Sequence, residues 1–284
     1  MEIMIHNPAD RAPLAAPLKH RVQSWLRKAH HRVLDRGLPR KVALYFHAMD
    51  EGEQKGLAHA VRFFRGEGYK TVASPEAFLS AKGRVLWVSF DDNYRAWYEA
   101  RPLLDDLQVR GTFYTNTGAF RDLATEAEID AYYDRLEFTG PRVPLTTDEL
   151  LALHTDGHVI AAHTHTHPNL GSVDEAQAAG EIRVGVERLE DLLGKAVNDF
   201  SYPYGMRRNF PDSLAEACAD AGVETIARAI PAMLHAPQGR RTAAGPREIH
   251  RHGWRAERTP YQNIRDLCAD GRAFERVTGR SAVG

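Results

Sequence analysis

Residues 84–93 read RVLWVSFDDN, an apolar run that ends in two aspartates and an asparagine. A short apolar run followed by turn residues is typical of a buried strand. We therefore predict a strand over residues 84–90, the most hydrophobic of the chain, with Asp91 and Asp92 directly after it. In barrel enzymes, polar side chains at this end of a strand form the active site. Asp-Asp-Asn is also ordinary turn chemistry, so this stretch alone leaves both interpretations open.

Segments of the same kind recur on both sides of this run, and segments of helical periodicity separate them. Further strands are predicted over residues 42–46, 70–73, 111–116, 158–162, 197–202 and 223–227, with an additional candidate over 247–252. Helices are predicted over residues 54–66, 96–107, 147–154, 174–193 and 211–221. Such alternation indicates an α/β fold built from β-α units, and seven or eight strands favour a barrel over an open sheet.

Composition and charge limit the classes of protein to consider. The 284 residues are 43% apolar and 26% charged, which is typical of a globular core and argues against disorder, collagen or a coiled coil. Residues 1–41 carry nine Lys or Arg against three Asp or Glu, and residues 228–284 carry eleven against five, so each end has a net charge of +6. The middle segment carries 17 against 30, a net of −13. This acidic centre argues against a nucleic-acid binder and suits a cation-binding pocket.

A second cluster follows the strand predicted over residues 158–162. Residues 162–168 read AHTHTHP, and His163 and His167 have the i, i+4 spacing that lets two imidazoles face one metal ion. His165 lies between them and would point away. One carboxylate of the first cluster with the two histidines makes a set of three ligands with space for water, as in a catalytic zinc site.

A third cluster, FSYPYG at residues 200–205, follows the strand predicted over residues 197–202. Aromatic side chains around Pro and Gly can form the wall of a sugar-sized groove and present a backbone N–H to a developing oxyanion. We expect Tyr202 and Pro203 to contact the substrate. An aromatic turn that closes the barrel is the alternative interpretation.

These three motifs in this order resemble those of the polysaccharide deacetylases, the NodB-homology proteins of carbohydrate esterase family 4. The matching residues are SFDD at 89–92, HTHTHP at 163–168 and YPYG at 202–205. The LYFH of residues 44–47 and the GYKTV of residues 68–72 also resemble early strand segments of that family. The resemblance covers residues 41–228 and continues more weakly to about residue 255.

The resemblance implies a distorted (β/α) barrel and a divalent metal ion, commonly zinc, with cobalt or manganese as alternatives. Carried over residue by residue, it implies that Asp92, His163 and His167 bind the metal. Asp91 matches the general base of the family. Tyr204 matches the residue whose backbone N–H helps to stabilise the tetrahedral oxyanion.

Three departures from the family pattern affect these expectations. Asn93 replaces a usual Gly after the two aspartates, and we expect it to contact the substrate. Ser201 replaces an Arg that orients the base in many members. The late motif with a general-acid histidine is not clear. Of His235, His250 and His252 we favour His250, which lies near the end of the last candidate strand.

The leading hypothesis is a metal-dependent hydrolase that removes the N-acetyl group from an N-acetylated sugar or a polysaccharide precursor. A second hypothesis keeps the metal site and assigns it another C–N bond, in a small amide or imide. The loops that line the pocket would decide between the two, and residues 117–145 are the longest candidate insertion. A third hypothesis is a glycan-binding protein without catalytic activity. The retention of Asp91 beside a full set of ligands argues against that hypothesis.

The first 40 residues are expected to form a basic amphipathic helical segment, and residues 41–284 the catalytic domain. Within residues 18–34, apolar side chains including Trp25 recur at helical spacing among Lys and Arg. Such a helix either packs on the barrel or binds an anionic membrane surface weakly.

No apolar run of about 18 residues and no secretory signal core is present, so we predict a cytoplasmic protein, with peripheral contact at the inner membrane face as the alternative. There the substrate would be a precursor such as a lipid-linked sugar.

Overall fold

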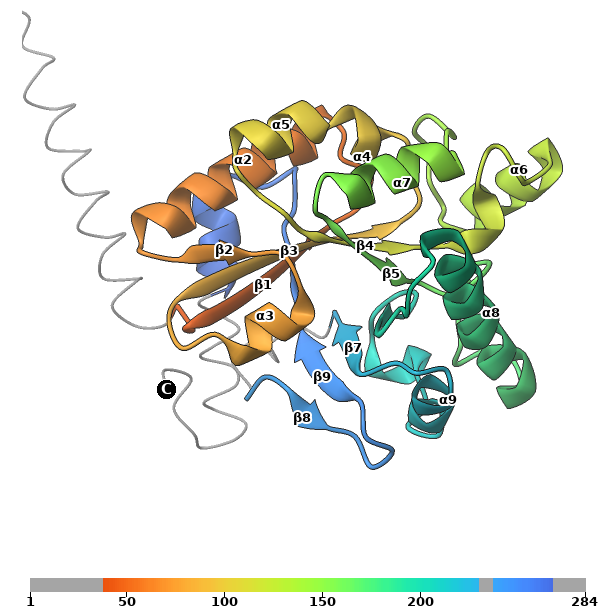
Figure 1. Cartoon of the computed structure of the whole chain (residues 1–284). Coiled ribbons are helices and arrows are strands. Elements are labelled where there is room, and N and C mark those ends of the chain that lie inside the picture. The colour runs from red at the N-terminus through yellow and green to blue at the C-terminus, as the bar shows by residue number, and fades with distance from the viewer. Residues whose placement is uncertain (1–37, 230–236, 268–284) are drawn as a thin grey trace, which may run out of the picture.

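A computed structural model describes residues 38–229 and 237–267 and has a curled, mostly parallel sheet surrounded by helices (Figure 1). The strands are β1 (Lys41–Phe46), β2 (Lys70–Val72), β3 (Val85–Asp92), β4 (Thr112–Thr115), β5 (Val159–Ala162), β6 (Asp199–Ser201), β7 (Thr225–Arg228), β8 (Arg240–Arg241), β9 (Arg247–His250) and β10 (His252–Gly253). Their order is β10-β1-β3-β4-β5-β6-β7-β9-β8, and β2 also pairs with β3. The β8–β9 pair is antiparallel, and the other pairs are parallel.

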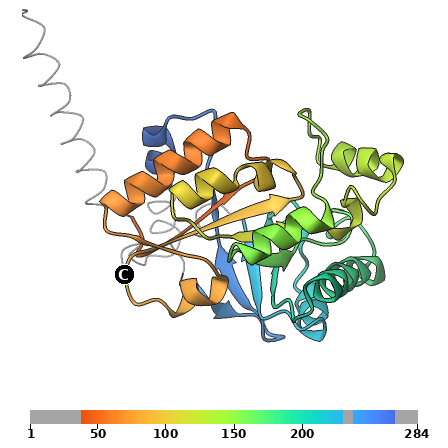
Figure 2. The same cartoon turned by 45° about the horizontal axis from the view of Figure 1, so that its top comes forward.

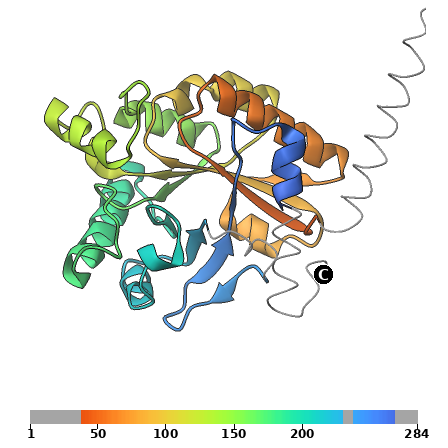
Figure 3. The same cartoon turned by 180° about the vertical axis from the view of Figure 1, so that it is seen from behind.

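One short segment joins the two sides of this sheet. β9 pairs with β7, β10 pairs with β1, and Arg251 is the only residue between β9 and β10. Figure 3 shows this segment in blue as it runs up to the red β1 strand. The sheet therefore curls into the distorted (β/α) barrel that the sequence predicts, and Arg251 lies at the junction.

Helices cover the outside of the sheet, and α2, α5 and α7 lie along one side of it (Figure 2). The helices are α2 (Glu51–Gly66), α3 (Pro75–Ser80), α4 (Ala96–Glu99), α5 (Arg101–Asp106), α6 (Glu126–Arg135), α7 (Thr147–Thr155), α8 (Glu175–Leu193) and α9 (Leu214–Asp220), with 3-10 turns η1 (Thr117–Ala119) and η2 (Arg207–Asn209). Thr146 and Glu149 form a complete capping box at the start of α7. None of the helices in the described ranges is long and apolar enough to cross a bilayer.

All eight predicted strands are present, with differences in detail. The last is divided into β9 and β10, and β8 was not predicted. The helix predicted over residues 96–107 is two helices, because Pro102 lies in the first turn of α5 and starts a new helix there. α3 and α6 were also not predicted, although Thr125 and Glu128 give α6 a capping box that the sequence displays. Residues 18–34, of the predicted amphipathic helix, lie outside the described residues.

Asn93 joins three parts of the fold just after β3. Its side-chain amide donates to the backbone carbonyl of Asn116 (3.2 Å) and accepts from the backbone N–H of Leu145 (2.9 Å). Its own carbonyl accepts from the Tyr133 hydroxyl (3.1 Å). The side chain is completely buried, so these bonds have no competition from water.

We expect Asn93→Ala to lower the free energy of unfolding by about 2 kcal/mol, because it leaves two buried backbone groups without partners. Asn198→Ala is the matched control, since that exposed amide donates a single bond, to Gly222, and should cost no more than about 0.5 kcal/mol. Urea denaturation of both variants measures the difference. Equal stability of the two would contradict the anchoring role of Asn93.

His158 makes stability depend on pH. Its Nδ1 accepts the backbone N–H of Gly111 (3.1 Å), and burial with the charge of Arg110 lowers the pKa of His158 from 6.5 to about 4. Because the pKa of His158 is lower in the folded chain than in the unfolded chain, its neutral ring stabilises the fold fully above pH 6.5. This stabilisation is lost as the pH falls toward 4. Between pH 7 and pH 5 the loss is about 2 kcal/mol.

His158→Asn keeps an acceptor for Gly111 but does not titrate. The stability of this variant, from urea titrations at pH 7 and pH 5, should therefore fall by less than that of the unmodified chain. The same pH dependence in both proteins would refute the assignment to His158.

Candidate active site

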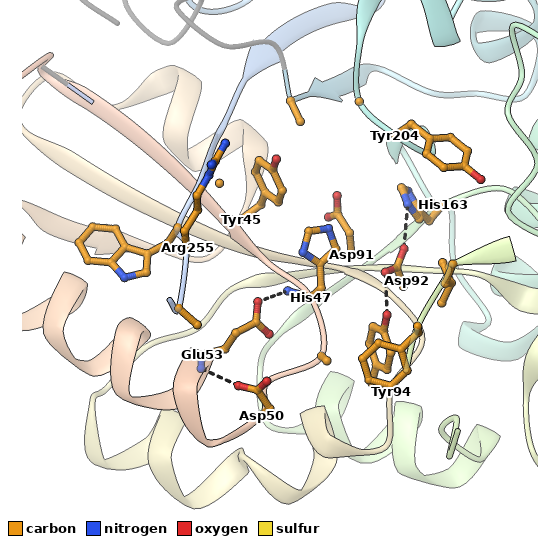
Figure 4. A pocket seen from close by; sticks show the side chains of 18 of the residues that line it. Tyr45, His47, Asp50, Glu53, Asp91, Asp92, Tyr94, His163, Tyr204 and Arg255 are labelled. Carbon is orange, nitrogen blue, oxygen red and sulfur yellow. Dashed lines mark hydrogen bonds and ion pairs between the residues drawn. The ribbon is translucent and has the colours of Figure 1, made fainter. Parts of the chain in front are cut away.

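The carboxyl ends of the parallel strands surround a cavity of about 600 Å³ (Figure 4). Residues at the ends of β1, β3 and β10 or directly after β1, β3, β5, β6, β7 and β10 line it, together with two apolar side chains of the 117–145 insertion, Leu136 and Phe138. The sequence-predicted residues among them are Asp91, Asp92, His163, His167, Tyr202 and Tyr204. The barrel therefore brings together in one cavity side chains that lie up to 113 positions apart in the chain.

The three predicted metal ligands converge in this cavity. The Nε2 atoms of His163 and His167 lie 3.4 and 3.1 Å from Oδ1 of Asp92, and one ligand atom from each residue lies within 4.8 Å of the other two. All three side chains are buried. Among the described residues this is the one cluster of His, Cys, Asp or Glu whose ligand atoms come this close together.

Neighbouring groups set the chemical state of these ligands. The Nδ1–H of His163 donates to the carbonyl of Ser201 (2.8 Å), which leaves Nε2 free to coordinate, and the Tyr94 hydroxyl donates to Oδ2 of Asp92 (3.1 Å). Burial alone would raise the pKa of Asp92, but the adjacent imidazoles of His163 and His167 hold that pKa well below its usual range. Burial also lowers the pKa of His167. An anionic carboxylate with neutral imidazoles is the protonation state that metal binding needs.

This donor set fits a divalent ion. Two nitrogen ligands and one oxygen ligand with open positions suit Zn²⁺ in particular. Nδ1 of His167 is buried and has no hydrogen-bond partner among the described residues, so the ring orientation rests on packing and on its contact with Asp92.

Asp92 and His167 have left-handed backbone angles, φ 89° and 65°. Such angles cost about 1–3 kcal/mol each in non-glycine residues and are concentrated at functional sites.

A buried arginine holds Asp91 in place. Arg251 Nη1 and Nη2 donate to the two carboxylate oxygens of Asp91 at 2.6 and 2.8 Å, a bidentate pair. The same guanidinium also donates to the hydroxyls of Ser89 (2.8 Å) and Ser201 (2.6 Å). Arg251 is 2% exposed. The arginine that the sequence lacks at position 201 is thus supplied from the β9–β10 junction, and its guanidinium contacts Ser201 directly.

The third motif forms one wall of the cavity. Tyr204 has φ 65° and is 51% exposed, although its ring packs 5.3 Å from the ring of His167 and its hydroxyl donates to the Arg135 carbonyl (3.2 Å). Tyr202 also lines the cavity, but its ring stacks on Phe210 and its hydroxyl donates to the Gly205 carbonyl. An exposed aromatic ring held this firmly can act as a platform for a ligand.

Two residues predicted to contact the substrate lie outside the cavity lining. Pro203 is buried, and Asn93 uses both ends of its amide for the backbone bonds described above. Asn93 therefore has a structural role, at the turn that follows Asp91 and Asp92.

A histidine that the sequence analysis did not single out does line the cavity. His47 directly follows β1, and its ring lies between Glu53 and Asp91 in the view of Figure 4. Its backbone is held on both sides, because its N–H donates to Glu53 (3.1 Å) and its carbonyl accepts from the indole of Trp97 (2.6 Å). Its side chain is exposed and lies within range of the Asp92 charge.

The three histidines considered for the general acid have other positions. His250 ends β9, is 5% exposed and is not in the cavity lining. Burial and the charge of Arg228 lower the pKa of His250 to about 4, so at neutral pH it is an uncharged imidazole. His252 lies in β10 and also outside the lining, and His235 lies outside the described residues.

Sequence signals for the missed residues existed. His47 comes directly after a predicted strand, as the other site residues do. Alternation along the last strand places Arg251 on the same face as the buried Ile249, which points it into the barrel. Neither signal shows which distant side chain the residue would meet.

Comparison with known proteins agrees with this site. The family model described as polysaccharide deacetylase matches residues 79–226, slightly more than half of the chain. No curated relative matches the chain significantly. The deacetylase PplD of Streptococcus pyogenes, solved in complex with acetate, is 20% identical, with 81% of this chain and 99% of that chain covered and a TM-score of 0.59.

Other solved structures share the fold at lower identity. IcaB from Ammonifex degensii is 17% identical, with coverage of 80% and 96% and a TM-score of 0.57. A de-N-acetylase from Aggregatibacter actinomycetemcomitans is 14% identical, with coverage of 78% and 98% and a TM-score of 0.55. At these identities the similarity concerns the fold, whereas the family model covers all three motifs. The chain therefore belongs to the polysaccharide deacetylase family.

Proposed function

We propose that the chain is a metal-dependent hydrolase that removes the N-acetyl group from an N-acetylated sugar, releasing acetate and a free amine. The observation that carries the proposal is the pairing of two different carboxylates at the end of β3. The Asp92 carboxylate faces the two histidines, and the Asp91 carboxylate pairs with the guanidinium of Arg251. One carboxylate is thereby free to bind a metal ion while its neighbour handles a proton.

A divalent ion held by Asp92, His163 and His167 would supply the Lewis acid that activates water and polarises the acetamide carbonyl. Asp91 accepts the proton of the attacking water. Arg251 fixes the orientation of the Asp91 carboxylate through two hydrogen bonds, and a general base must be held within hydrogen-bond reach of the proton that it accepts.

Two further groups complete the reaction. The backbone N–H of Tyr204, in its left-handed conformation, donates to the oxygen that becomes negative as the carbonyl is attacked. His47 protonates the amine as the C–N bond breaks. His47 replaces His250 in this role because His47 lines the cavity and His250 does not.

The cavity favours a sugar over a small amide or imide. About 600 Å³ exceeds what a small amide needs, and the exposed Tyr204 ring together with Leu136 and Phe138 offers apolar faces for a pyranose ring. The glycan-binding hypothesis depended on a missing arginine and a missing acid. Arg251 bonds to Asp91 and His47 lines the cavity, which supports a catalytic protein.

The metal and base roles can be separated experimentally. The full chain should bind about one Zn²⁺, and His167→Ala should weaken binding 10-fold or more, because it removes one ligand of the set. Asp91→Asn should keep the metal but lose about 100-fold to 10,000-fold in rate. Metal content and acetate release from N-acetylglucosamine oligosaccharides are the measurements.

The corresponding control is Asp92→Asn, which should lose the metal. If Asp91→Asn lost the metal and Asp92→Asn retained it, the roles of the two aspartates would be exchanged. Unchanged metal content in His163→Ala and His167→Ala would refute the proposed site.

The general-acid role of His47 has its own signature. We expect His47→Ala to slow acetate release from an N-acetylated sugar about 100-fold or more, because the amine must leave with a proton. The loss should be much smaller with an aryl acetate, whose phenolate leaves unprotonated. Steady-state rates on both substrates test this, with the exposed His59→Ala as the control for a histidine outside the cavity. An equal loss on both substrates would rule out proton donation.

A further inference from the structure

A carboxylate outside the cavity is turned toward the loop that carries both histidine ligands. Glu181 lies in the second turn of α8, and its Oε2 accepts the backbone N–H groups of His165 (2.9 Å) and Thr166 (2.7 Å). Its Oε1 accepts the Thr166 hydroxyl (2.7 Å). The backbone carbonyl of Glu181 also lies 3.1 Å from the His165 nitrogen. Glu181 thus binds the two residues at the centre of the stretch between the ligands.

The backbone of α8 approaches the same loop closely. A Cβ atom on Gly185 would lie 2.9 Å from the backbone carbonyl carbon of Thr164, so the contact needs a residue without a side chain. Gly180, on the same helix, has nothing within 4 Å of such an atom. Glycine in a helix interior is unfavourable, and at position 185 the contact with the loop accounts for it.

The loop needs external support because its own conformation is strained. Thr164 and His167 have φ 68° and 65°, and neither is glycine. From the end of β4 and from η1, the Asn116 amide bonds to the His163 carbonyl, and Gly118 N–H donates to the His165 carbonyl (2.8 Å). With the Glu181 side chain removed, the N–H and the hydroxyl of Thr166 lose their acceptors, and the His165 N–H keeps only the backbone carbonyl of residue 181.

We propose that Glu181 is a positioning residue of the metal site, which fixes residues 163–167 so that both imidazoles face Asp92. The inference rests on the proposed metal-dependent function. Glu181 does not itself reach the metal ligands, and it acts through the backbone between them. Groups that orient ligands in this way typically contribute 10-fold to 100-fold to metal affinity.

The test is a competition titration of Zn²⁺ between the full chain and a chromogenic chelator, with the melting temperature of the metal-free protein measured in parallel. Glu181→Ala should weaken Zn²⁺ binding about 10-fold to 100-fold. Glu181→Gln should stay near the affinity of the unmodified chain, because the amide oxygen accepts the two N–H groups and the amide nitrogen can donate to the Thr166 hydroxyl. Glu187→Ala is the matched control, since Glu187 pairs with Arg183 on the exposed face of the same helix.

A second pair of variants tests the contact without touching Glu181. Gly185→Ala should weaken Zn²⁺ binding by pushing against Thr164, and Gly180→Ala should leave it unchanged. Unchanged affinity in both Glu181→Ala and Gly185→Ala, with Zn²⁺ bound by the unmodified chain, would overturn the positioning role alone. A loss in Glu181→Gln as large as in Glu181→Ala would also overturn it, because the carboxylate charge would then be responsible. Failure of the unmodified chain to bind Zn²⁺ would overturn the proposed metal site as well.

Discussion

The ion pair between Arg251 and Asp91 is the interaction on which the site and the closure of the barrel both depend. Moving two charges out of water costs several kcal/mol each, and a buried pair offsets that cost only with good geometry and further hydrogen bonds. Both conditions are met here, because the contact is bidentate and the guanidinium also reaches Ser89 and Ser201. The rings of Tyr45 and Tyr114 lie 5.1 and 5.0 Å from the guanidinium carbon and favour a cation between them.

This pair also explains why the last strand is interrupted. β9 pairs with β7 and β10 pairs with β1, and Arg251 is the residue at which the chain passes from one partner to the other. A residue at that junction can direct a long side chain into the barrel. The closure of the sheet and the orientation of the Asp91 carboxylate thus have the same physical origin.

The rest of the site is held by buried polar contacts between neighbouring strand ends. Asn116 links the end of β4 to the histidine loop, and Asn93 links the end of β3 to the insertion. Each such amide must be fully paired, because an unpaired polar group is costly in a region of low dielectric. The loops that carry the ligands therefore keep one conformation, and the backbone strain at Asp92 and His167 persists because these contacts over-determine it.

The sequence by itself determined the strands other than β8, the candidate metal-binding group of Asp92, His163 and His167, and the adjacent Asp91. These features are local: apolar runs form the strands, two histidines share one turn, and parallel strands bring their carboxyl ends to one face. Only the tertiary structure decided which residues complete the site. Arg251 lies 160 positions from Asp91, His47 is 116 positions from His163, and Glu181 belongs to a helix with no motif of its own. Their roles come from packing between segments far apart in the chain, and no periodicity or spacing within one segment encodes such contacts.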